Sequence, residues 1–226
     1  MKNLFLFFVA ASLFFAAPAY SQVGKDSGFW EFTEPTKDYH KSSVLIKSSI
    51  GSGTGILIEG DYIVTAKHVV DEVQDDSIVV FIKGHGSFKA KLVASTRGYI
   101  SDISVLKALE PIPAEVARIK VGDTPEIGDE VEIVGYGLTR DISERVRSWK
   151  SKVKHFNHTE DNMWLDTYAI PGDSGGAIIN ANGELVGVLS GGSFWVNQTI
   201  KGYYNPTWPV RTTSIDELKK LLESLS

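Results

Sequence analysis

The sequence contains no cysteine among its 226 residues. A disulfide framework is therefore excluded, and stability has to come from a buried apolar core, which a chain of this length can build. Long runs of lysine or arginine are also absent, and the formal net charge is −5. An acidic chain without a basic patch argues against nucleic acid and against an anionic membrane surface as the main partner.

Long apolar runs are absent except at the start of the chain. Residues 1–19 combine Lys2, an apolar stretch and the small-residue pattern APA that ends at Ala19. This order is typical of a secretory signal peptide, whereas the apolar stretch is short for a membrane anchor. We expect cleavage after Ala19 and a secreted or periplasmic product that has no membrane contact once the signal is removed. Residues 20–40 carry weak signals and are interpreted as an N-terminal arm or a pro-segment.

The rest of the chain is a series of short apolar or alternating runs that are separated by glycine-rich turns. Many short strands at this spacing are typical of an all-β barrel or sandwich. The period changes near the end of the chain, where apolar residues recur at helical spacing after Ser214. Ser214 is a suitable N-cap, so the pattern predicts an amphipathic C-terminal helix.

Three reactive side chains fall at the edges of these runs. His68 lies in "YIVTAKHVV", Asp102 in "DISVLK", and Ser174 in the glycine turn "PGDSGGAI". Each residue alone has an ordinary interpretation, because such side chains are common in turns, caps and surfaces. Together they have a chemical one. A serine hydroxyl needs a neighbouring base to become a nucleophile, an imidazole can be that base, and a carboxylate can fix its tautomer.

The motifs around these residues resemble, in their order, those of the trypsin-like serine proteases with the chymotrypsin fold. The segment "GSGTGILI" precedes the histidine motif, and "LVGVLSGG" follows the serine motif. The chain is most similar to the compact bacterial branch, near the extracellular glutamyl endopeptidases and the high-temperature-requirement proteases, without the PDZ domain of the latter. The resemblance implies an all-β fold of two six-stranded antiparallel β-barrels with a C-terminal α-helix. We place the first barrel at 41–113, the second at 114–212 and the helix at 213–226.

The resemblance also implies roles for individual residues. His68 would be the general base, Asp102 the carboxylate that orients it and Ser174 the nucleophile. The backbone amides of Gly172 and Ser174 would form the oxyanion hole, and the hydroxyl of Ser190 would reach Asp102. The residues expected to line the substrate-binding pocket are Tyr168, Ala169, Ile170, Ser190, Gly191 and Gly192.

Specificity and activation are less constrained by the sequence. Tyr168 stands where trypsin itself has a buried acid, so we expect an apolar or small residue, rather than lysine or arginine, before the cut. In the family, Asp173 would pair with a newly cut N-terminus. Here the sequence leaves open whether the N-terminus after signal removal, a pro-segment or another group pairs with it. His155 and His158 are interpreted as part of a solvated loop, so neither a metal nor a cofactor is expected.

The sequence therefore predicts an exported serine endopeptidase that cleaves peptide or protein substrates through an acyl-enzyme intermediate and acts as a monomer. One alternative is a non-cleaving binding protein on a protease fold, although such proteins usually lose a triad member and all three are retained here. The other alternative is a narrow esterase or processing activity from the same triad, because a fold does not fix a substrate.

Overall fold

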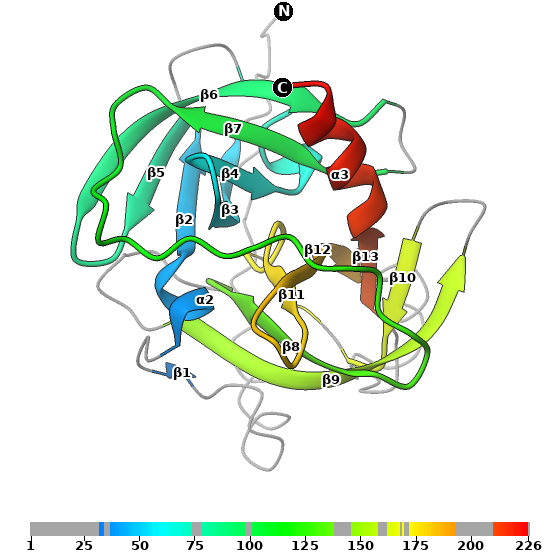
Figure 1. The fold of residues 1–226 in the computed structure, drawn as a ribbon. Helices are drawn as coiled ribbons and strands as arrows, with labels where there is room; N and C mark the ends of the chain where they lie inside the picture. The colour runs from blue at the N-terminus through cyan, green and yellow to red at the C-terminus, as the bar shows by residue number, and fades with distance from the viewer. Residues whose placement is uncertain are drawn as a thin grey trace, which may run out of the picture. The chain divides into compact units, whose positions relative to one another are not determined.

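The computed structural model of the chain describes mainly β-structure (Figure 1). It describes residues 32–33, 37–73, 78–97, 101–137, 146–157, 162–167, 169, 172–192 and 210–225. The predicted signal peptide lies outside these residues, as does most of the predicted arm. No helix among the described residues is long and apolar enough to cross a membrane.

The first barrel is closed by six antiparallel strands in the order β2-β3-β4-β7-β6-β5. The strands are β2 (Ser43–Ser48), β3 (Gly51–Ile58), β4 (Tyr62–Thr65), β5 (Ile78–Ile82), β6 (Gly86–Ser95) and β7 (Ser104–Ala108). Their β-branched and apolar residues suit a pleated surface with one buried face. Val44, Leu57, Ile63 and Leu106 meet inside the barrel and are fully buried.

The second barrel also has six antiparallel strands, and the pairing of β8 with β9 closes it. The strands are β8 (Glu130–Gly135), β9 (Val146–Asn157), β10 (Asn162–Leu165), β11 (Ala177–Ile179), β12 (Leu185–Gly192) and β13 (Val210–Ser214). A short strand, β1 (Phe32–Thr33), pairs with the edge of β9. The predicted fold class of two six-stranded antiparallel barrels is therefore confirmed.

Strand β9 is the longest strand described, and sequence analysis assigned no strand to it. Lys150, Lys152 and Lys154 are exposed, whereas Ser151 and Val153 between them are buried. This alternation is a period-two signal, but the lysines on the exposed face make the segment resemble a solvated loop.

Three helices complete the described structure: α2 (Asp38–Lys41), the 3-10 turn η1 (Lys67–Val69) and α3 (Ile215–Glu223). The hydroxyl of Ser214 accepts a hydrogen bond from the backbone N–H of Asp216 at 3.3 Å, so Ser214 is the N-cap of α3. Ile215 and Leu218 are buried where α3 packs against β6, β12 and β13. The predicted C-terminal helix is confirmed, and it begins at Ile215 because Ser214 still pairs with β12.

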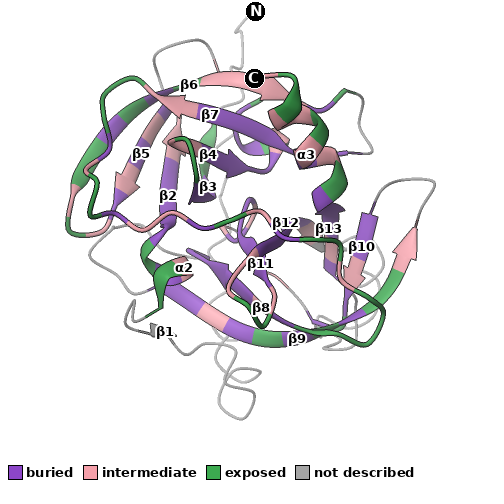
Figure 2. Ribbon diagram, in the orientation of Figure 1, coloured by how far each residue is buried: buried purple, intermediate pink, exposed green. Residues whose placement is uncertain are grey.

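One cluster of buried side chains joins the two barrels. Leu45 and Val105 of the first barrel share this cluster with Val134 and Val188 of the second. Figure 2 shows the buried residues concentrated along strands such as β2, β7 and β11. Full burial of each such side chain is worth about 1.5–3 kcal/mol, so this shared core holds together the strand ends that carry the candidate site.

Candidate active site

The ladder between β4 and β7 positions His68 and Asp102. Thr65 at the end of β4 lies opposite Ser104 at the start of β7. His68 follows Thr65 by three residues and Asp102 precedes Ser104 by two, so both side chains leave the ladder at the same end. The backbone N–H of Lys67 donates to the carbonyl of Asp102 at 3.3 Å, which fastens the two segments to each other.

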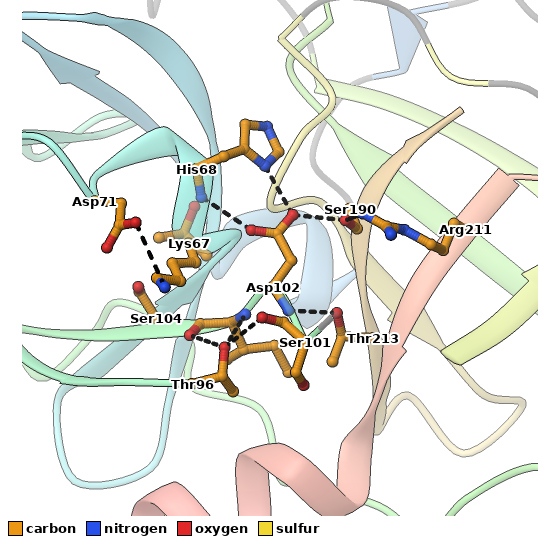
Figure 3. Close-up of polar contacts among 12 residues, drawn as sticks. Lys67, His68, Asp71, Thr96, Ser101, Asp102, Ser104, Ser190, Arg211 and Thr213 are labelled. Carbon is orange, nitrogen blue, oxygen red and sulfur yellow. Dashed lines mark hydrogen bonds and ion pairs between the residues drawn. The ribbon is translucent and has the colours of Figure 1, made fainter. Parts of the chain in front are cut away.

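His68 is held by both oxygens of the Asp102 carboxylate (Figure 3). Nδ1 of His68 lies 2.7 Å from Oδ2, and the backbone N–H of His68 donates to Oδ1 at 2.9 Å. A charged carboxylate can only accept a hydrogen bond, so in the neutral imidazole Nδ1 carries the proton and Nε2 keeps its lone pair. The imidazole side chain is about half exposed, at 51%. The pair thus presents an oriented base toward solvent.

Asp102 itself is buried and makes further hydrogen bonds, both as acceptor and as donor. Ser190 Oγ donates to Oδ2 at 2.5 Å, and the backbone N–H of Asp102 donates to Thr213 Oγ1 at 3.1 Å. Burial raises the pKa of Asp102, but the hydrogen bonds from His68 and Ser190 outweigh it and bring the pKa below its ordinary value. The carboxylate therefore stays ionised at neutral pH.

Ser174 lies in a turn whose neighbouring residues have backbone conformations that favour glycine. Gly172 and Gly175 have φ angles of 97° and 83°, which side chains other than glycine rarely adopt. A Cβ on Gly175 would lie 2.0 Å from the carbonyl oxygen of Thr54 and 2.2 Å from Oγ1 of Thr65. The glycines around Ser174 thus allow the turn to press against β3 and β4 of the first barrel.

Thr54 of β3 holds this turn with both its backbone and its side chain. Its N–H donates to the carbonyl of Ser174 at 2.8 Å, and its hydroxyl donates to the carbonyl of Gly172 at 2.8 Å. The same hydroxyl accepts from the N–H of Tyr136 at 2.8 Å, and the Thr54 carbonyl accepts from Thr65 Oγ1 at 2.7 Å. Sequence analysis missed this role, although Thr54 stands inside the quoted "GSGTGILI" motif.

Arg147 of β9 is the partner of Asp173 that the sequence left open. Nη1 of Arg147 lies 2.8 Å from Oδ1 and 2.6 Å from Oδ2, and both side chains are fully buried. The N–H of Gly137 also donates to Oδ1 at 2.8 Å. The guanidinium lies over the ring of Trp149, 4.6 Å from its centroid. The residue before Ser174 is therefore anchored from inside the second barrel.

Gly53 separates the histidine segment from the serine turn. A Cβ on Gly53 would lie 2.8 Å from the side chain of Val69, the neighbour of His68, and 2.9 Å from the carbonyl oxygen of Ser174. His68 and Ser174 thus belong to segments on two sides of one small residue. Within the described residues, no hydrogen bond joins His68 to the Ser174 hydroxyl.

The residues expected to line a pocket are only partly described. Tyr168 and Ile170 lie outside the described residues, Ala169 is half-buried, and Gly192 is the last residue of β12. Ser190 is buried against Asp102, and Gly191 lies opposite Arg211 in the ladder of β12 and β13. Across the described ranges no three His, Asp or Glu side chains gather as a metal site would require.

These features define a class of protein, the two-barrel scaffold of chymotrypsin-like proteases. A His–Asp pair lies at the end of a ladder of one barrel, and Gly53 separates the histidine segment from the glycine-bounded serine turn of the other. Residues 53–188 match the family of the trypsin-like peptidase domain, and the chain belongs to that family.

Curated proteins are similar in sequence to part of this chain. It is 35% identical to the serine endoprotease DegS of Salmonella typhimurium and 34% identical to that of Escherichia coli, in each case over 149 residues. It is 31% identical over 146 residues to a probable periplasmic serine protease do/HhoA-like of Haemophilus influenzae. The alignments cover 62% and 61% of this chain but 39% of DegS and 30% of the H. influenzae protein. The chain thus spans about two fifths of the DegS length.

Solved structures share the fold. Two crystal structures of inactive forms of the protease Rv3671c, one described as being from M. tuberculosis H37Rv, match with TM-scores of 0.62 and 0.61. The identities are 19% and 20%, and both matches cover 82% of this chain. The matches cover 87% and 89% of the Rv3671c chains, and they show that the architecture is shared.

Proposed function

We propose that the protein is an exported serine endopeptidase that hydrolyses peptide bonds through Ser174, His68 and Asp102. The observation that carries the proposal is the double attachment of His68 to Asp102, through Nδ1 at 2.7 Å and the backbone N–H at 2.9 Å. An imidazole fixed in this way offers Nε2 as a base on the side facing solvent. Membership of the trypsin-like peptidase family, which acts on peptides and proteins, supports the proposal.

The proposed reaction has two halves. In the first, Ser174 Oγ attacks the carbonyl carbon of the peptide bond while Nε2 of His68 takes the hydroxyl proton. The imidazolium then gives this proton to the departing amine nitrogen, the C–N bond breaks and an acyl-enzyme ester remains. In the second half a water molecule attacks the ester by the same proton route. Its attack releases the carboxylic acid product and restores the Ser174 hydroxyl.

The charge that develops on the carbonyl oxygen requires hydrogen-bond donors. We assign the backbone amides of Gly172 and Ser174 to this task. The support is that Thr54 holds the carbonyls of both residues, at 2.8 Å each, so the turn has little freedom to rotate. Loss of one such donor typically lowers the rate by about 10²–10³-fold.

Location, substrate and assembly form the rest of the proposal. Residues 1–19 have the order of a signal peptide, and one relative is named as a probable periplasmic protease. We therefore place the processed protein, starting at Tyr20, in the periplasm or outside the cell. It acts as a monomer on peptide or protein substrates.

Degradation of unfolded casein tests the proposal against its two alternatives. We expect new peptide termini, mapped by mass spectrometry, from the wild-type protein and none from a Ser174→Ala variant. Turnover of an activated ester without any new peptide termini would favour the narrow esterase. Stable binding of casein with neither reaction would favour the non-cleaving binding protein.

A further inference from the structure

Arg211 of β13 reaches the candidate active site through one serine hydroxyl. Its Nη2 donates to Ser190 Oγ at 3.0 Å, and Ser190 Oγ lies 2.5 Å from Oδ2 of Asp102. The same Oδ2 lies 2.7 Å from Nδ1 of His68. Figure 3 shows the guanidinium, the hydroxyl, the carboxylate and the imidazole following one another in a row. A single hydroxyl group therefore separates Arg211 from the carboxylate oxygen that orients the base.

The pairing of β12 with β13 produces this row. The register of the ladder shifts at Ser190, so this residue is the extra one of a bulge in β12. A bulge re-aims a side chain, and here the hydroxyl points to Asp102. On β13, Arg211 and Thr213 are two residues apart and share a face, and Thr213 Oγ1 accepts from the backbone N–H of Asp102 at 3.1 Å. One face of β13 thus supports Asp102 twice, once directly and once through Ser190.

The hydroxyl of Ser190 has a single proton and two partners. A guanidinium only donates hydrogen bonds, whereas an ionised carboxylate only accepts them. Ser190 therefore accepts from Arg211 and gives its own proton to Asp102, and no other assignment satisfies both contacts. Without the guanidinium the hydroxyl could turn about its C–O bond and donate elsewhere. Arg211 thus determines the direction in which the Ser190 proton points.

The hydrogen bond that Arg211 secures acts on the charge of Asp102. Burial raises the pKa of Asp102, and the hydrogen bonds from His68 and Ser190 outweigh it and bring the pKa below its ordinary value. Hydrogen bonds in a chain polarise one another, so the positive charge of Arg211 strengthens the bond from Ser190 to the carboxylate. A carboxylate shared in this way holds an imidazolium less tightly, which favours unprotonated His68 as the base.

The charged side chains around the candidate site are arranged in pairs. In the described part of the chain these pairs are Lys67 with Asp71, Arg147 with Asp173, and Arg211 with Asp102 through the Ser190 hydroxyl. The first two cations contact their carboxylates directly, at 3.4 and 2.6 Å. Arg211 reaches its carboxylate through a hydroxyl instead, so its charge acts on the acid that orients the imidazole.

We propose that Arg211 is a positioning residue of the reaction, because it fixes the Ser190 hydroxyl as a donor to Asp102 and so holds His68 as an oriented, unprotonated base. This inference rests on the proposed peptidase function and adds a residue to the support of the same site. It requires no contact between Arg211 and the substrate. The effect of Arg211 should therefore appear in kcat and in the pH dependence of the rate, and not in KM.

Three variants of Arg211 test the proposal. Arg211→Met removes the donor and the charge, so kcat should fall about 3- to 10-fold with KM changed less than about twofold. The acid limb of its kcat/KM profile should move to higher pH by about half a unit, because the imidazolium is held more tightly. Arg211→Lys, which is charged and only donates, should restore most of the rate and move the limb back. Arg211→Gln should behave like Arg211→Met, because its amide oxygen can accept the Ser190 proton.

A double-mutant cycle tests whether Arg211 acts through Ser190. Without the Ser190 hydroxyl there is nothing to position, so Arg211→Met should change kcat less than about twofold when it is combined with Ser190→Ala. Thr212→Val is the control for a loss of stability, because the Thr212 hydroxyl, on the same strand, donates to the carbonyl of Met163 at 3.1 Å. Thr212→Val should leave the pH profile unchanged. An equal effect of Arg211→Met with and without Ser190, a change confined to KM, or an unmoved pH profile would overturn the inference.

Failure of the proposed function has a different signature. Titration of His68 by NMR in Ser174→Ala protein requires no turnover, and its midpoint should move to higher pH when Arg211→Met is added. A wild-type protein that cleaves no peptide and gives no fluorophosphonate adduct overturns the peptidase function, and the NMR shift would then still support an action of Arg211 on His68. A protein that cleaves peptides, and whose His68 titrates identically with and without Arg211→Met, overturns only the inference.

Discussion

Arg147 and Asp173 form a fully buried ion pair directly behind the proposed nucleophile. One guanidinium nitrogen lies 2.6 and 2.8 Å from the two carboxylate oxygens. In trypsin-like zymogens a newly cut N-terminus supplies the positive charge for the corresponding acid. Here the charge comes from β9, inside the same barrel. Asp173, the residue before Ser174, is therefore held by an arginine of its own barrel.

The first prediction concerns Arg147→Met. Removing one member of a buried ion pair leaves the other charge uncompensated, which typically lowers the free energy of unfolding by about 3–5 kcal/mol. We expect that loss in chemical denaturation, together with slower fluorophosphonate labelling of the fraction that stays folded. A double variant, Arg147→Met with Asp173→Asn, should regain stability while its labelling stays slow.

Arg118→Met is the matched control for this prediction. Arg118 binds Asp61 at 2.6 Å, but the Asp61 side chain is 38% exposed and the pair is remote from the Ser174 turn in the chain. Loss of the Arg118–Asp61 pair should lower the free energy of unfolding by less than loss of the Arg147–Asp173 pair does. It should leave fluorophosphonate labelling of the folded protein unchanged. Full labelling of folded Arg147→Met protein would show that the ion pair does not order the turn.

The second prediction concerns the hydroxyl of Thr54. Thr54→Val keeps the shape of the side chain and removes its bonds to Gly172 and Tyr136. A small displacement of the turn can lower a rate as much as 10²-fold, so we expect kcat to fall roughly 10- to 100-fold with little change in KM. Thr54→Ser restores the hydroxyl and should restore most of the rate.

Thr212→Val separates this effect from a general loss of packing. The Thr212 hydroxyl is also buried and also donates to a backbone carbonyl, that of Met163 at 3.1 Å. We expect thermal unfolding to show similar destabilisation in both valine variants, with kcat falling only in Thr54→Val. A parallel fall of kcat in both would refute a positioning role for Thr54.

The third prediction concerns the charge of Asp102. Asp102→Asn keeps the shape but stabilises the wrong tautomer of His68, so turnover of peptides should fall about 10⁴-fold with the fold intact. The pKa of Asp102 is already below its ordinary value of 3.8. Asp102 therefore stays ionised at any pH above that value, and its protonation should lower wild-type turnover only below it. Retention of a tenth or more of the rate by the asparagine variant would exclude the proposed role.

A second polar cluster ties α2 to the second barrel. Glu132 of β8 contacts His40 at 3.1 Å and accepts hydrogen bonds from Lys37 at 2.8 Å, from Tyr39 at 2.7 Å and from Ser148. Burial raises the pKa of Glu132, but the contacts with His40 and Lys37 and the other hydrogen bonds outweigh it and hold the pKa well below its ordinary value of 4.5.

The fourth prediction follows from the direction of that shift. As the pH falls below about 4.5, unfolded Glu132 takes up a proton before the folded form does, so wild-type stability decreases toward acid. Glu132→Gln removes this contribution, so its free energy of unfolding should depend less on pH between about 3 and 5. At pH 7 the variant should be less stable by about 1–3 kcal/mol because charged hydrogen bonds are lost.

Glu130→Gln is the control, two residues earlier on the same strand. Glu130 is 68% exposed and lies 4.0 Å from Lys152, so its removal should change stability by less than about 1 kcal/mol. Urea unfolding across this pH range measures both variants. An unchanged slope in Glu132→Gln would show that the cluster does not hold this carboxyl ionised.

The sequence predicted the fold and the positions of the reactive side chains because both are marked by local patterns. Short strands between glycines indicated an all-β barrel or sandwich, the resemblance to trypsin-like proteases implied two barrels, and His68, Asp102 and Ser174 each stood in a recognisable motif. The ladder of β4 and β7 accounts for why His68 and Asp102 meet, since their neighbours Thr65 and Ser104 pair.

The supporting residues could not be predicted in the same way, because their roles arise from tertiary contacts. Arg147 is 26 residues from Asp173 and lies in a lysine-rich strand that resembles a loop. Thr54 contacts Gly172 across 118 residues of chain. Arg211 reaches the hydroxyl of Ser190 because β13 pairs with β12.

Labelling of Ser174 by a fluorophosphonate probe tests the central claim most directly. The account predicts one adduct on Ser174 of the protein that starts at Tyr20, mapped by mass spectrometry. The adduct should be absent from Ser174→Ala and strongly slowed in Asp102→Asn. A folded protein that gives no adduct, either from Tyr20 or after residues 20–40 are trimmed, would contradict the account and leave a scaffold without an assembled nucleophile.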